Sequence, residues 1–220
     1  DEIISVVVAP CTAKKWEIVG TDTDYVITTR ELAYMIKEVG VDIDSSKEVD
    51  MDLLLGHGSK SGLLFGRSGG VMEAALSYAH YLLTGKKAQE GQFRLNIEGP
   101  ITEASYKMGD SIIDVAVVYG LKNLEKILSQ KEKYDFIEVM NCRGGCIGGG
   151  GQPLGTRQDI EVRRKKRSDC LDEQINSAIY PYDNNSIKEL YDSYIITPNG
   201  ELAHKLLHKE HEDLSHLIDD

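Results

Sequence analysis

The chain has 220 residues, enough for one sizeable domain or two smaller lobes that share a core. Hydrophobic residues make up 41% and charged residues 28%, a globular balance that excludes a disordered chain. Asp and Glu outnumber Lys and Arg by 36 to 25, which gives a formal charge of −11. This charge excludes nucleic acid as the main partner, because phosphate binding needs a basic face. One basic run, residues 163–167, opposes the trend and is interpreted as a solvated helix face or surface segment.

The sequence also bounds the cellular setting. No stretch approaches the roughly 18 apolar residues of a membrane-spanning helix, so no membrane span is expected. The first residues lack the basic and apolar parts of a signal peptide, and no initiator Met precedes them. We therefore expect a cytoplasmic chain that is a cut, processed or engineered domain. Four cysteines in such a chain favour metal or redox chemistry over a disulfide framework.

The N-terminal part predicts a strand followed by a helix. Residues 3–9 are apolar and β-branched and predict a buried strand that ends at Pro10. This strand would present the segment Pro-Cys-Thr-Ala-Lys-Lys, residues 10–15, at its carboxyl end. Thr28 and Glu31 have the spacing of a capping box and predict the start of a helix that Gly40 ends. One face of that helix carries Leu32, Met35, Ile36 and Val39.

The middle of the chain predicts a loop and then a helix. Residues 42–61 are acidic and polar and predict a loop with short apolar pieces. Gly69 and Gly70 open a mostly apolar helix over residues 71–83. Its lack of a polar face predicts burial on most sides.

A strand–helix–strand unit follows. Strands are predicted over residues 111–118 and 136–140, with a helix after Gly120 that turns Leu121, Leu124 and Leu128 inward. This order predicts a right-handed parallel unit. A glycine-rich loop, residues 142–151, comes directly after the second strand, at the sheet edge where ligands of open α/β sheets bind.

From Gln158 the chain is polar and charged, with amphipathic helices expected over residues 186–194 and 201–208. The predicted fold is α/β, a parallel sheet with flanking helices. Residues 1–155 are expected to form the core, and residues 156–220 a C-terminal helical belt that packs on it.

The strongest chemical signal is the loop block at residues 140–153, Met-Asn-Cys-Arg-Gly-Gly-Cys-Ile-Gly-Gly-Gly-Gly-Gln-Pro. Cys142 and Cys146 stand four positions apart among glycines, which let amide N–H groups approach the inorganic sulfur of a bulky anionic cluster. Soft thiolates favour iron–sulfur or zinc. Cys11 supplies a third thiol, and Lys14 a cation that would stabilise a ligated thiolate.

Other interpretations of these residues are weaker. A structural zinc site needs paired short ligand spacings, whereas Cys11 stands alone and far from the loop. A phosphate-binding loop needs Gly-Lys-Ser/Thr, which does not follow Gly151. Cys170 lies in a charged stretch and is read as a free cysteine that binds no metal, and His57 as a loop histidine. His204 and His208 are one helical turn apart, but without an evident third ligand they are read as a helix face.

Three blocks in order resemble the iron-only hydrogenases. The first is Pro-Cys-Thr-Ala-Lys-Lys-Trp-Glu at residues 10–17, and the second is Phe-Gly-Arg-Ser-Gly-Gly-Val-Met-Glu-Ala-Ala at residues 65–75. The third runs from Glu138 to Pro153 and contains the cysteine loop. The tail around residues 203–208 is also similar, so the resemblance spans nearly the whole chain. It implies an H-cluster domain that interconverts protons, electrons and H₂, with ferredoxin or another redox protein as electron partner.

The resemblance implies a role for six residues. In that family a [4Fe–4S] cubane is bridged through one cysteine to a di-iron subcluster that bears CO and cyanide ligands. By position, Cys11, Cys142 and Cys146 would be three cubane ligands, with Cys146 the bridge. Lys14 would donate a hydrogen bond to a cyanide of the di-iron centre. Met140 and Phe65 would line the di-iron pocket, with ordinary core packing as the equal alternative for both.

Several family features have no counterpart in this sequence. The paired cysteines that precede the lysine block in that family are absent; one ligates the cubane and the other relays protons. A missing N-terminal segment or a partner subunit would therefore supply the fourth cysteine. Ala9 stands where catalytic members usually have Met, and Arg67 with Ser68 replaces a smaller or threonine-bearing pair.

These departures lead to three expectations. The first is an H-cluster-binding portion of an iron-only hydrogenase or of a hydrogenase-like H₂ or redox sensor, inactive alone. The alternative is an iron–sulfur carrier or assembly protein, related to hydrogenases but without a di-iron centre. A purely structural domain without a cluster is the third.

Overall fold

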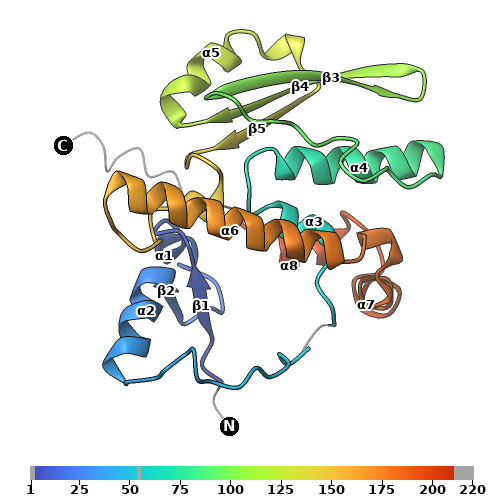
Figure 1. Cartoon of the computed structure of the whole chain (residues 1–220). Coiled ribbons are helices and arrows are strands. Elements are labelled where there is room, and N and C mark those ends of the chain that lie inside the picture. The colour runs from blue at the N-terminus through green and yellow to red at the C-terminus, as the bar shows by residue number, and fades with distance from the viewer. Residues whose placement is uncertain (1–2, 54–55, 211–220) are drawn as a thin grey trace. The chain divides into compact units, whose positions relative to one another are not determined.

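The computed structural model describes residues 3–53 and 56–210 (Figure 1). The chain forms two compact units. The first unit comprises Asp1–Asp50 and Gly58–Pro181, and the second comprises Met51–His57 and Tyr182–Asp220. No helix among the described residues is long and apolar enough to cross a membrane.

The first unit begins with a two-stranded parallel sheet made of β1 (Val6–Ala9) and β2 (Tyr25–Thr28). Between them lies α1 (Lys14–Glu17), and after them α2 (Thr29–Glu38). The predicted first strand and the predicted helix are therefore confirmed, whereas β2 is a strand that the sequence analysis missed. The capping box is present, because the Thr28 side chain accepts from the Glu31 amide and the Glu31 carboxylate accepts from the Thr28 amide.

The predicted burial of the first strand is wrong. Val6, Val7 and Val8 are 52%, 41% and 47% exposed, and only Ala9 is buried. Among the described residues β1 pairs with β2 alone, and Val6, Val7 and Val8 belong to none of the hydrophobic core clusters, so their side chains stay in contact with solvent. The predicted loop at residues 42–61 is confirmed up to the start of α3 (Lys60–Leu64), except for residues 54–55, which lie outside the described residues.

The second sheet of this unit is mixed. Its strands are β3 (Ile101–Met108), β4 (Ser111–Tyr119) and β5 (Phe136–Met140). β4 and β5 run parallel, as predicted, with Tyr119 opposite Met140, while β3 pairs antiparallel with β4. β3 was missed by the sequence analysis, although its polar and apolar residues alternate from Glu103 to Met108, the pattern of a half-buried strand.

Two helices cover opposite faces of this sheet (Figure 1). Residues of β4 alternate in direction, so Val115 and Val117 pack with residues of α4 (Gly70–Thr84). Ala116 and Val118 pack instead with Ile127 of α5 (Leu124–Leu128). All four β4 residues are at most 1% exposed. The predicted α4 is confirmed, and the sheet ends in β5, which leads directly into the cysteine loop.

Two burial predictions for these helices are wrong in part. Leu121 and Leu128 are 60% and 51% exposed, and Ile127 is the buried residue of α5. The segment opens with a 3-10 turn, Leu121–Asn123, which rotates the following helix away from the face that a continuous α-helix would bury. In α4 the buried residues lie in the first half of the helix, between Gly70 and Leu76. Leu82 and Leu83, near its end, are 66% and 71% exposed.

A long helix, α6 (Arg157–Ser177), completes the first unit. It lies within the expected C-terminal helical belt, but its bounds were not predicted, because its sequence has no apolar stripe to mark them. Its start is marked by a capping box between Thr156 and Asp159. Ile175 packs with Leu64 of α3 and Ala74 of α4, so α6 is fixed on these two helices. Further 3-10 turns lie at Lys131–Lys133, Cys146–Gly148 and Pro181–Asp183.

The second unit contains α7 (Asn185–Leu190), a π-helical turn at Tyr191–Ile195 and α8 (Glu201–Leu207). The two helices predicted near residues 186–194 and 201–208 are thus confirmed, the first with a π-helical end. Asn184, 1% exposed, caps α7 and donates to the carbonyl of His57 at 2.7 Å. The division at residue 155 and the packing of residues 156–220 as a belt stay predictions, and residues 211–220 lie outside the described residues.

Candidate functional site

The glycine-rich loop after β5 contacts the end of β1. The Gly151 amide donates to the carbonyl of Pro10 at 2.8 Å. A Cβ on Gly149 would stand 2.2 Å from the same oxygen, and one on Gly151 would stand 3.0 Å from the Cys11 amide nitrogen. These distances leave no room for side chains, so the glycines allow the segment that carries Cys11 to lie directly on the loop.

The turn between α3 and α4 contacts the same loop. The Ile147 amide donates to the Gly66 carbonyl at 3.1 Å, and the Ser68 amide donates to the Gly144 carbonyl at 3.4 Å. Gly145 has φ +82°, and a Cβ there would lie 2.7 Å from the Arg67 backbone. The second sequence block therefore meets the third through the backbone, as the first does. Two segments far apart in the sequence therefore converge on the loop.

The Cys146 thiol is affected by its neighbours. All three cysteines are free; Cys11 and Cys142 are half-buried, and Cys146 is exposed. The pKa of the Cys146 thiol is nevertheless raised, first by partial burial and then by the neighbouring Cys11 and Cys142 thiols. Lys14 acts on the same thiol in the opposite direction. Together with the hydrogen bond between the Gly151 amide and the Pro10 carbonyl, this places the Cys11 segment beside the loop that carries Cys142 and Cys146.

The thiols do not form a single-ion site. Among the described residues, no three or more His, Cys, Asp or Glu side chains group in a way that could hold a metal ion. The ligands of a cubane each bind a different iron and stand further apart than the ligands of one ion. The donor set of soft thiols fits such a cluster.

The other predicted residues lie at the ends of elements around the loop. Lys14 forms an ion pair with Glu17, and its side chain is 48% exposed. Met140 is half-buried at the end of β5, and Phe65, 49% exposed, ends α3. Cys170 is exposed on α6 and is not among the groups that act on Cys146.

Glu138 is a buried residue that sequence reasoning did not single out. It lies on β5, 4% exposed, and its two carboxylate oxygens accept from the amides of Gly69 at 2.6 Å and Met72 at 2.9 Å. Burial raises its pKa, while the amides at the start of α4 act to lower it. The sequence did contain a signal for this residue, because Glu138 is an acid inside an otherwise apolar strand. Its effect is to fix the turn before α4 against the strand that leads into the loop.

The interpretation of the basic run as a solvated face is wrong for two of its members. Arg164 has a side chain that is only 18% exposed, with its Cδ 3.2 Å from where a Cβ of Gly144 would stand. Arg167 donates from Nε to the carbonyl of Ile147 at 2.8 Å. The run is wound on α6, which turns these two positions to the loop and leaves Arg163, Lys165 and Lys166 exposed.

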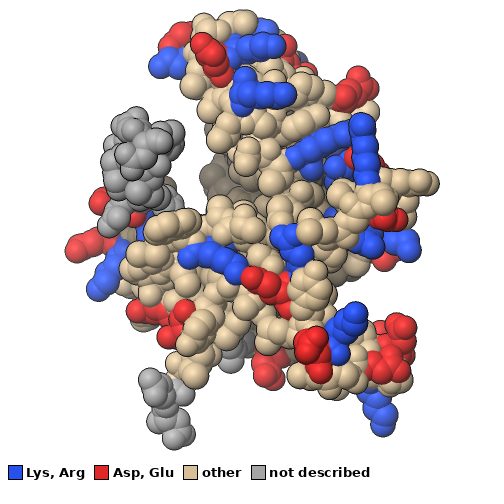
Figure 2. Space-filling model, turned by 90° about the vertical axis from the view of Figure 1, so that its left-hand side faces the viewer, with Lys and Arg blue, Asp and Glu red and all other residues tan. Residues whose placement is uncertain are grey.

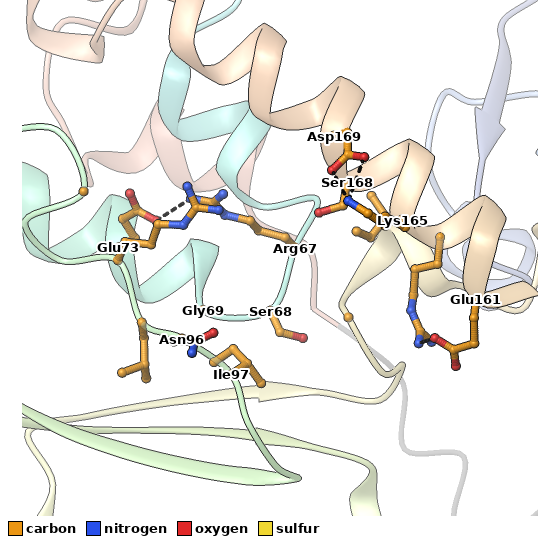
Figure 3. A pocket seen from close by; sticks show the side chains of 16 residues that line it. Arg67, Ser68, Gly69, Glu73, Asn96, Ile97, Glu161, Lys165, Ser168 and Asp169 are labelled. Carbon is orange, nitrogen blue, oxygen red and sulfur yellow. Dashed lines mark hydrogen bonds and ion pairs between the residues drawn. The ribbon is translucent and has the colours of Figure 1, made fainter.

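A cavity of about 730 Å³ lies beside the loop, between α6 and the turn before α4 (Figure 3). Its charged side chains are paired with one another: Arg67 with Glu73 at 2.7 Å, Lys165 with Asp169 at 3.1 Å, and Arg164 with Glu161. The buried Ser68 hydroxyl at its edge has no hydrogen-bond partner among the described residues. On the face shown in Figure 2, Lys and Arg are mixed with Asp and Glu and form no continuous basic surface.

With this arrangement described, similarity to known proteins decides the family. Residues 1–150 match the family model of the iron-only hydrogenase large subunit, C-terminal domain. The chain belongs to the iron-only hydrogenase family. Residues 160–213 match a second family model, the iron hydrogenase small subunit. The predicted family is thereby confirmed. Iron–sulfur and H-cluster chemistry is associated with this family.

Individual relatives agree with this assignment. The NADP-reducing hydrogenase subunit HndD of Solidesulfovibrio fructosivorans is 36% identical over 94% of this chain and 38% of its own length. A solved structure of an [FeFe]-hydrogenase HydA1 variant from Chlamydomonas reinhardtii aligns with a TM-score of 0.73 and 34% identity. That alignment covers 94% of this chain and 63% of the other, and it confirms the hydrogenase-like α/β fold.

A third relative has a different kind of name. Protein NAR1 of Arabidopsis thaliana is 28% identical over 96% of this chain and 50% of its own length. The relatives of this chain therefore include proteins that are named as hydrogenases and others that are not. The chain also spans less than half of the length of the curated hydrogenase HndD.

Proposed function

We propose that this chain is the H-cluster-binding portion of an iron-only hydrogenase or of a hydrogenase-like H₂ or redox sensor. The observation that carries the proposal is the close contact between the segment that carries Cys11 and the loop that carries Cys142 and Cys146, where the Gly151 amide donates to the Pro10 carbonyl at 2.8 Å. Because the chain belongs to the iron-only hydrogenase family, an iron–sulfur cluster is the ligand expected at these thiols. The whole enzyme would interconvert protons, electrons and H₂.

Cys11, Cys142 and Cys146 would hold a [4Fe–4S] cluster, with Cys146 as the bridge to a di-iron subcluster that carries CO and cyanide. The donor chemistry fits, because three free thiols are present and glycines line the loop between them. The cluster would supply electron storage and transfer when bound. The chain's own residues would hold it, limit its contact with water and balance its negative charge.

Lys14, Met140 and Phe65 would act around the di-iron side of the site. Lys14 would donate a hydrogen bond to a cyanide ligand, and its ammonium would offset cluster charge. This role requires Lys14 to leave its exposed ion pair with Glu17, which costs little because exposed pairs contribute weakly to stability. Met140 and Phe65 would supply apolar walls that keep water out.

The proposed function requires partners that supply a fourth cysteine, a proton relay and electrons. An N-terminal segment or a partner subunit would supply the fourth cubane cysteine and the proton relay, since the chain spans 38% of the length of HndD. A ferredoxin or another redox protein would deliver electrons. We propose a cytoplasmic location on the sequence alone.

An iron–sulfur assembly or carrier role is the second candidate, and it is favoured by the 27% identity with a relative named cytosolic Fe-S cluster assembly factor narfl, from Danio rerio. Such a protein would bind an iron–sulfur cluster through the same thiols and carry no di-iron centre. The two candidates therefore agree on Cys11, Cys142 and Cys146 and differ on CO and cyanide.

The first experiment is anaerobic reconstitution of the 220-residue chain with iron and sulfide. We expect bound iron and acid-labile sulfide and, after reduction, the electron paramagnetic resonance signal of a cubane. Cys142→Ser and Cys11→Ser should lose it, whereas Cys170→Ser should keep it. Absence of cluster in the parent chain, or loss in the Cys170 variant alone, would refute the proposed ligand set.

The second experiment separates the two candidates. The chain is joined to the upstream region encoded before it, co-expressed with the hydrogenase maturation enzymes and examined by infrared spectroscopy. Bands of metal-bound CO and cyanide are expected for a hydrogenase or a sensor. A protein that holds iron and sulfide but shows no such bands would be an assembly or carrier protein.

A further inference from the structure

The residue that follows Cys146, Ile147, is held by hydrogen bonds on both its carbonyl and its amide. Its carbonyl accepts a hydrogen bond from Arg167 Nε at 2.8 Å, across 20 residues of sequence. The amide of the same residue donates to the Gly66 carbonyl at 3.1 Å. Ile147 is thus tied to α6 through one group and to the turn before α4 through the other.

The loop around Cys146 needs such external support. Gly144 and Gly145 precede the cysteine with φ of +83° and +82°, and Gly148 to Gly151 follow shortly after it. Glycine loses more conformational freedom on folding than any other residue, so this segment holds its shape weakly by itself. A specific orientation of the Cys146 side chain therefore depends on contacts from elsewhere in the unit.

α6 supplies those contacts at several points. Besides the Arg167 hydrogen bond, the Arg164 side chain lies over Gly144 and Gly148, 3.2 and 3.5 Å from where their Cβ atoms would stand. Arg164 is paired with Glu161, which also lies 3.6 Å from Arg143 of the loop. Of these contacts, only the Arg167 hydrogen bond reaches the backbone next to Cys146.

We propose that Arg167 is a positioning residue for Cys146: by holding the Ile147 carbonyl from α6, it sets the orientation in which the Cys146 thiolate meets the cluster. This inference rests on the proposed function, which supplies the iron–sulfur cluster as the ligand of Cys146. It goes beyond the proposed function by assigning a role to α6. α6 lies largely in the part of the chain that matches the small subunit model, so cluster binding by residues 1–150 depends on that part.

The chemistry of arginine suits this role. Its guanidinium stays charged, is planar and donates several hydrogen bonds in fixed directions, so it orients a carbonyl more strictly than a lysine would. A charged donor also makes a stronger hydrogen bond than a neutral one. Lysine at this position keeps the charge and a donor, whereas methionine keeps only the approximate length of the side chain.

The test compares Arg167→Met and Arg167→Lys with the matched control Lys166→Met, which removes the same charge from an exposed neighbour on the same helix. Each chain is reconstituted anaerobically. Iron and sulfide content, the electron paramagnetic resonance spectrum of the reduced cluster, the rate of iron loss to a chelator and the melting temperature are measured.

Arg167→Met should lose iron about tenfold faster than the parent chain, the ratio expected for one charge-assisted hydrogen bond, and should show altered g-values. Arg167→Lys should recover most of both properties, and Lys166→Met should match the parent. An Arg167→Met chain with an unchanged spectrum and unchanged rate would overturn the inference. Equal effects from Lys166→Met would overturn it as well, because they would indicate a general effect of charge.

A second readout keeps this test separate from the proposed function. Hydrogen exchange of the Gly148 and Gly149 amides, both bonded within the loop, is measured on the chain without a cluster. Arg167→Met should speed exchange at these amides and leave the β4 amides unchanged. Unchanged exchange at the loop, or equal acceleration in β4 from general unfolding, would refute the positioning role. A parent chain that binds no iron and sulfide would instead refute the proposed function.

Discussion

At the scale of single residues, neighbouring glycines of the cysteine loop have different roles. A Cβ on Gly149 would stand 2.2 Å from the Pro10 carbonyl oxygen and 3.0 Å from that of Cys146. The nearest atom to a Cβ on Gly150 is the Thr12 hydroxyl, at 3.9 Å. Neither glycine has the positive φ that would strain an alanine, so only the available space distinguishes them.

We therefore expect Gly149→Ala to force the loop away from Cys11, with a loss of about 1–3 kcal/mol in the free energy of unfolding. Iron uptake on reconstitution should fall with it. Gly150→Ala is the control in the same loop and should retain stability and iron content. Urea denaturation and iron analysis measure both. Equal behaviour of the two variants would show that close approach to Pro10 is not what the loop requires.

Glu31 illustrates how one exposed carboxylate can affect the pH dependence of stability. Hydrogen bonds from Lys15 and then from Thr28 lower its pKa from 4.5 to about 2. A carboxyl group with a lowered folded-state pKa stabilises the fold above its unfolded pKa. That stability is lost as pH falls from 4.5 through about 2.

Glu31→Gln should therefore lower stability at neutral pH and weaken the loss of stability on acidification in this range. Urea midpoints measured at about pH 7 and about pH 3 for the two chains provide the comparison. The difference between the chains should be larger at the higher pH. A difference that grows on acidification would contradict the assignment.

At the scale of secondary-structure elements, Glu138 links β5 to the start of α4. Its carboxylate accepts the amides of Gly69 and Met72, in a site where the side chain is 4% exposed. Glu138→Leu would leave these buried donors without an acceptor, a loss of about 2 kcal/mol or more in the free energy of unfolding.

Glu138→Gln keeps one carbonyl acceptor and should lose less than Glu138→Leu. Urea denaturation gives the order of the three chains. Because burial raises the pKa of Glu138, its protonated form is favoured in the folded state, so the parent should gain stability from this group as pH falls. If Glu138→Leu proved as stable as the parent, hydrogen bonding at the start of α4 would not be what retains an acid on this strand.

At the scale of the whole molecule, the chain carries three of the four proposed cubane ligands and spans 38% of the length of HndD. The reconstituted chain alone should therefore evolve no H₂ from reduced methyl viologen, because the proposed function assigns the fourth ligand and the proton relay to residues outside it. Gas chromatography under anaerobic conditions measures this, with an intact iron-only hydrogenase as the positive control. Sustained H₂ production by the chain alone would mean that its own residues complete the site.

The sequence by itself determined the parts of this protein in which chemistry or local geometry is written in neighbouring residues. The capping box at Thr28, the strand at residues 136–140 and the cysteine loop are of this kind, since each depends on a short pattern. The family followed from the three blocks, because the spacing of thiols, lysine and glycines within each block is distinctive.

Tertiary structure decided what depends on residues far apart in the chain. The antiparallel pairing of β3, the exposed valines of β1 and the contact of Arg167 with Ile147 could not be predicted, because each is set by which neighbours cover or pair with a segment. α6 has no apolar stripe, so its place beside the loop comes from a few contacts such as Ile175 with Leu64. Local patterns specify elements, whereas burial and long-range hydrogen bonds exist only once the elements have packed.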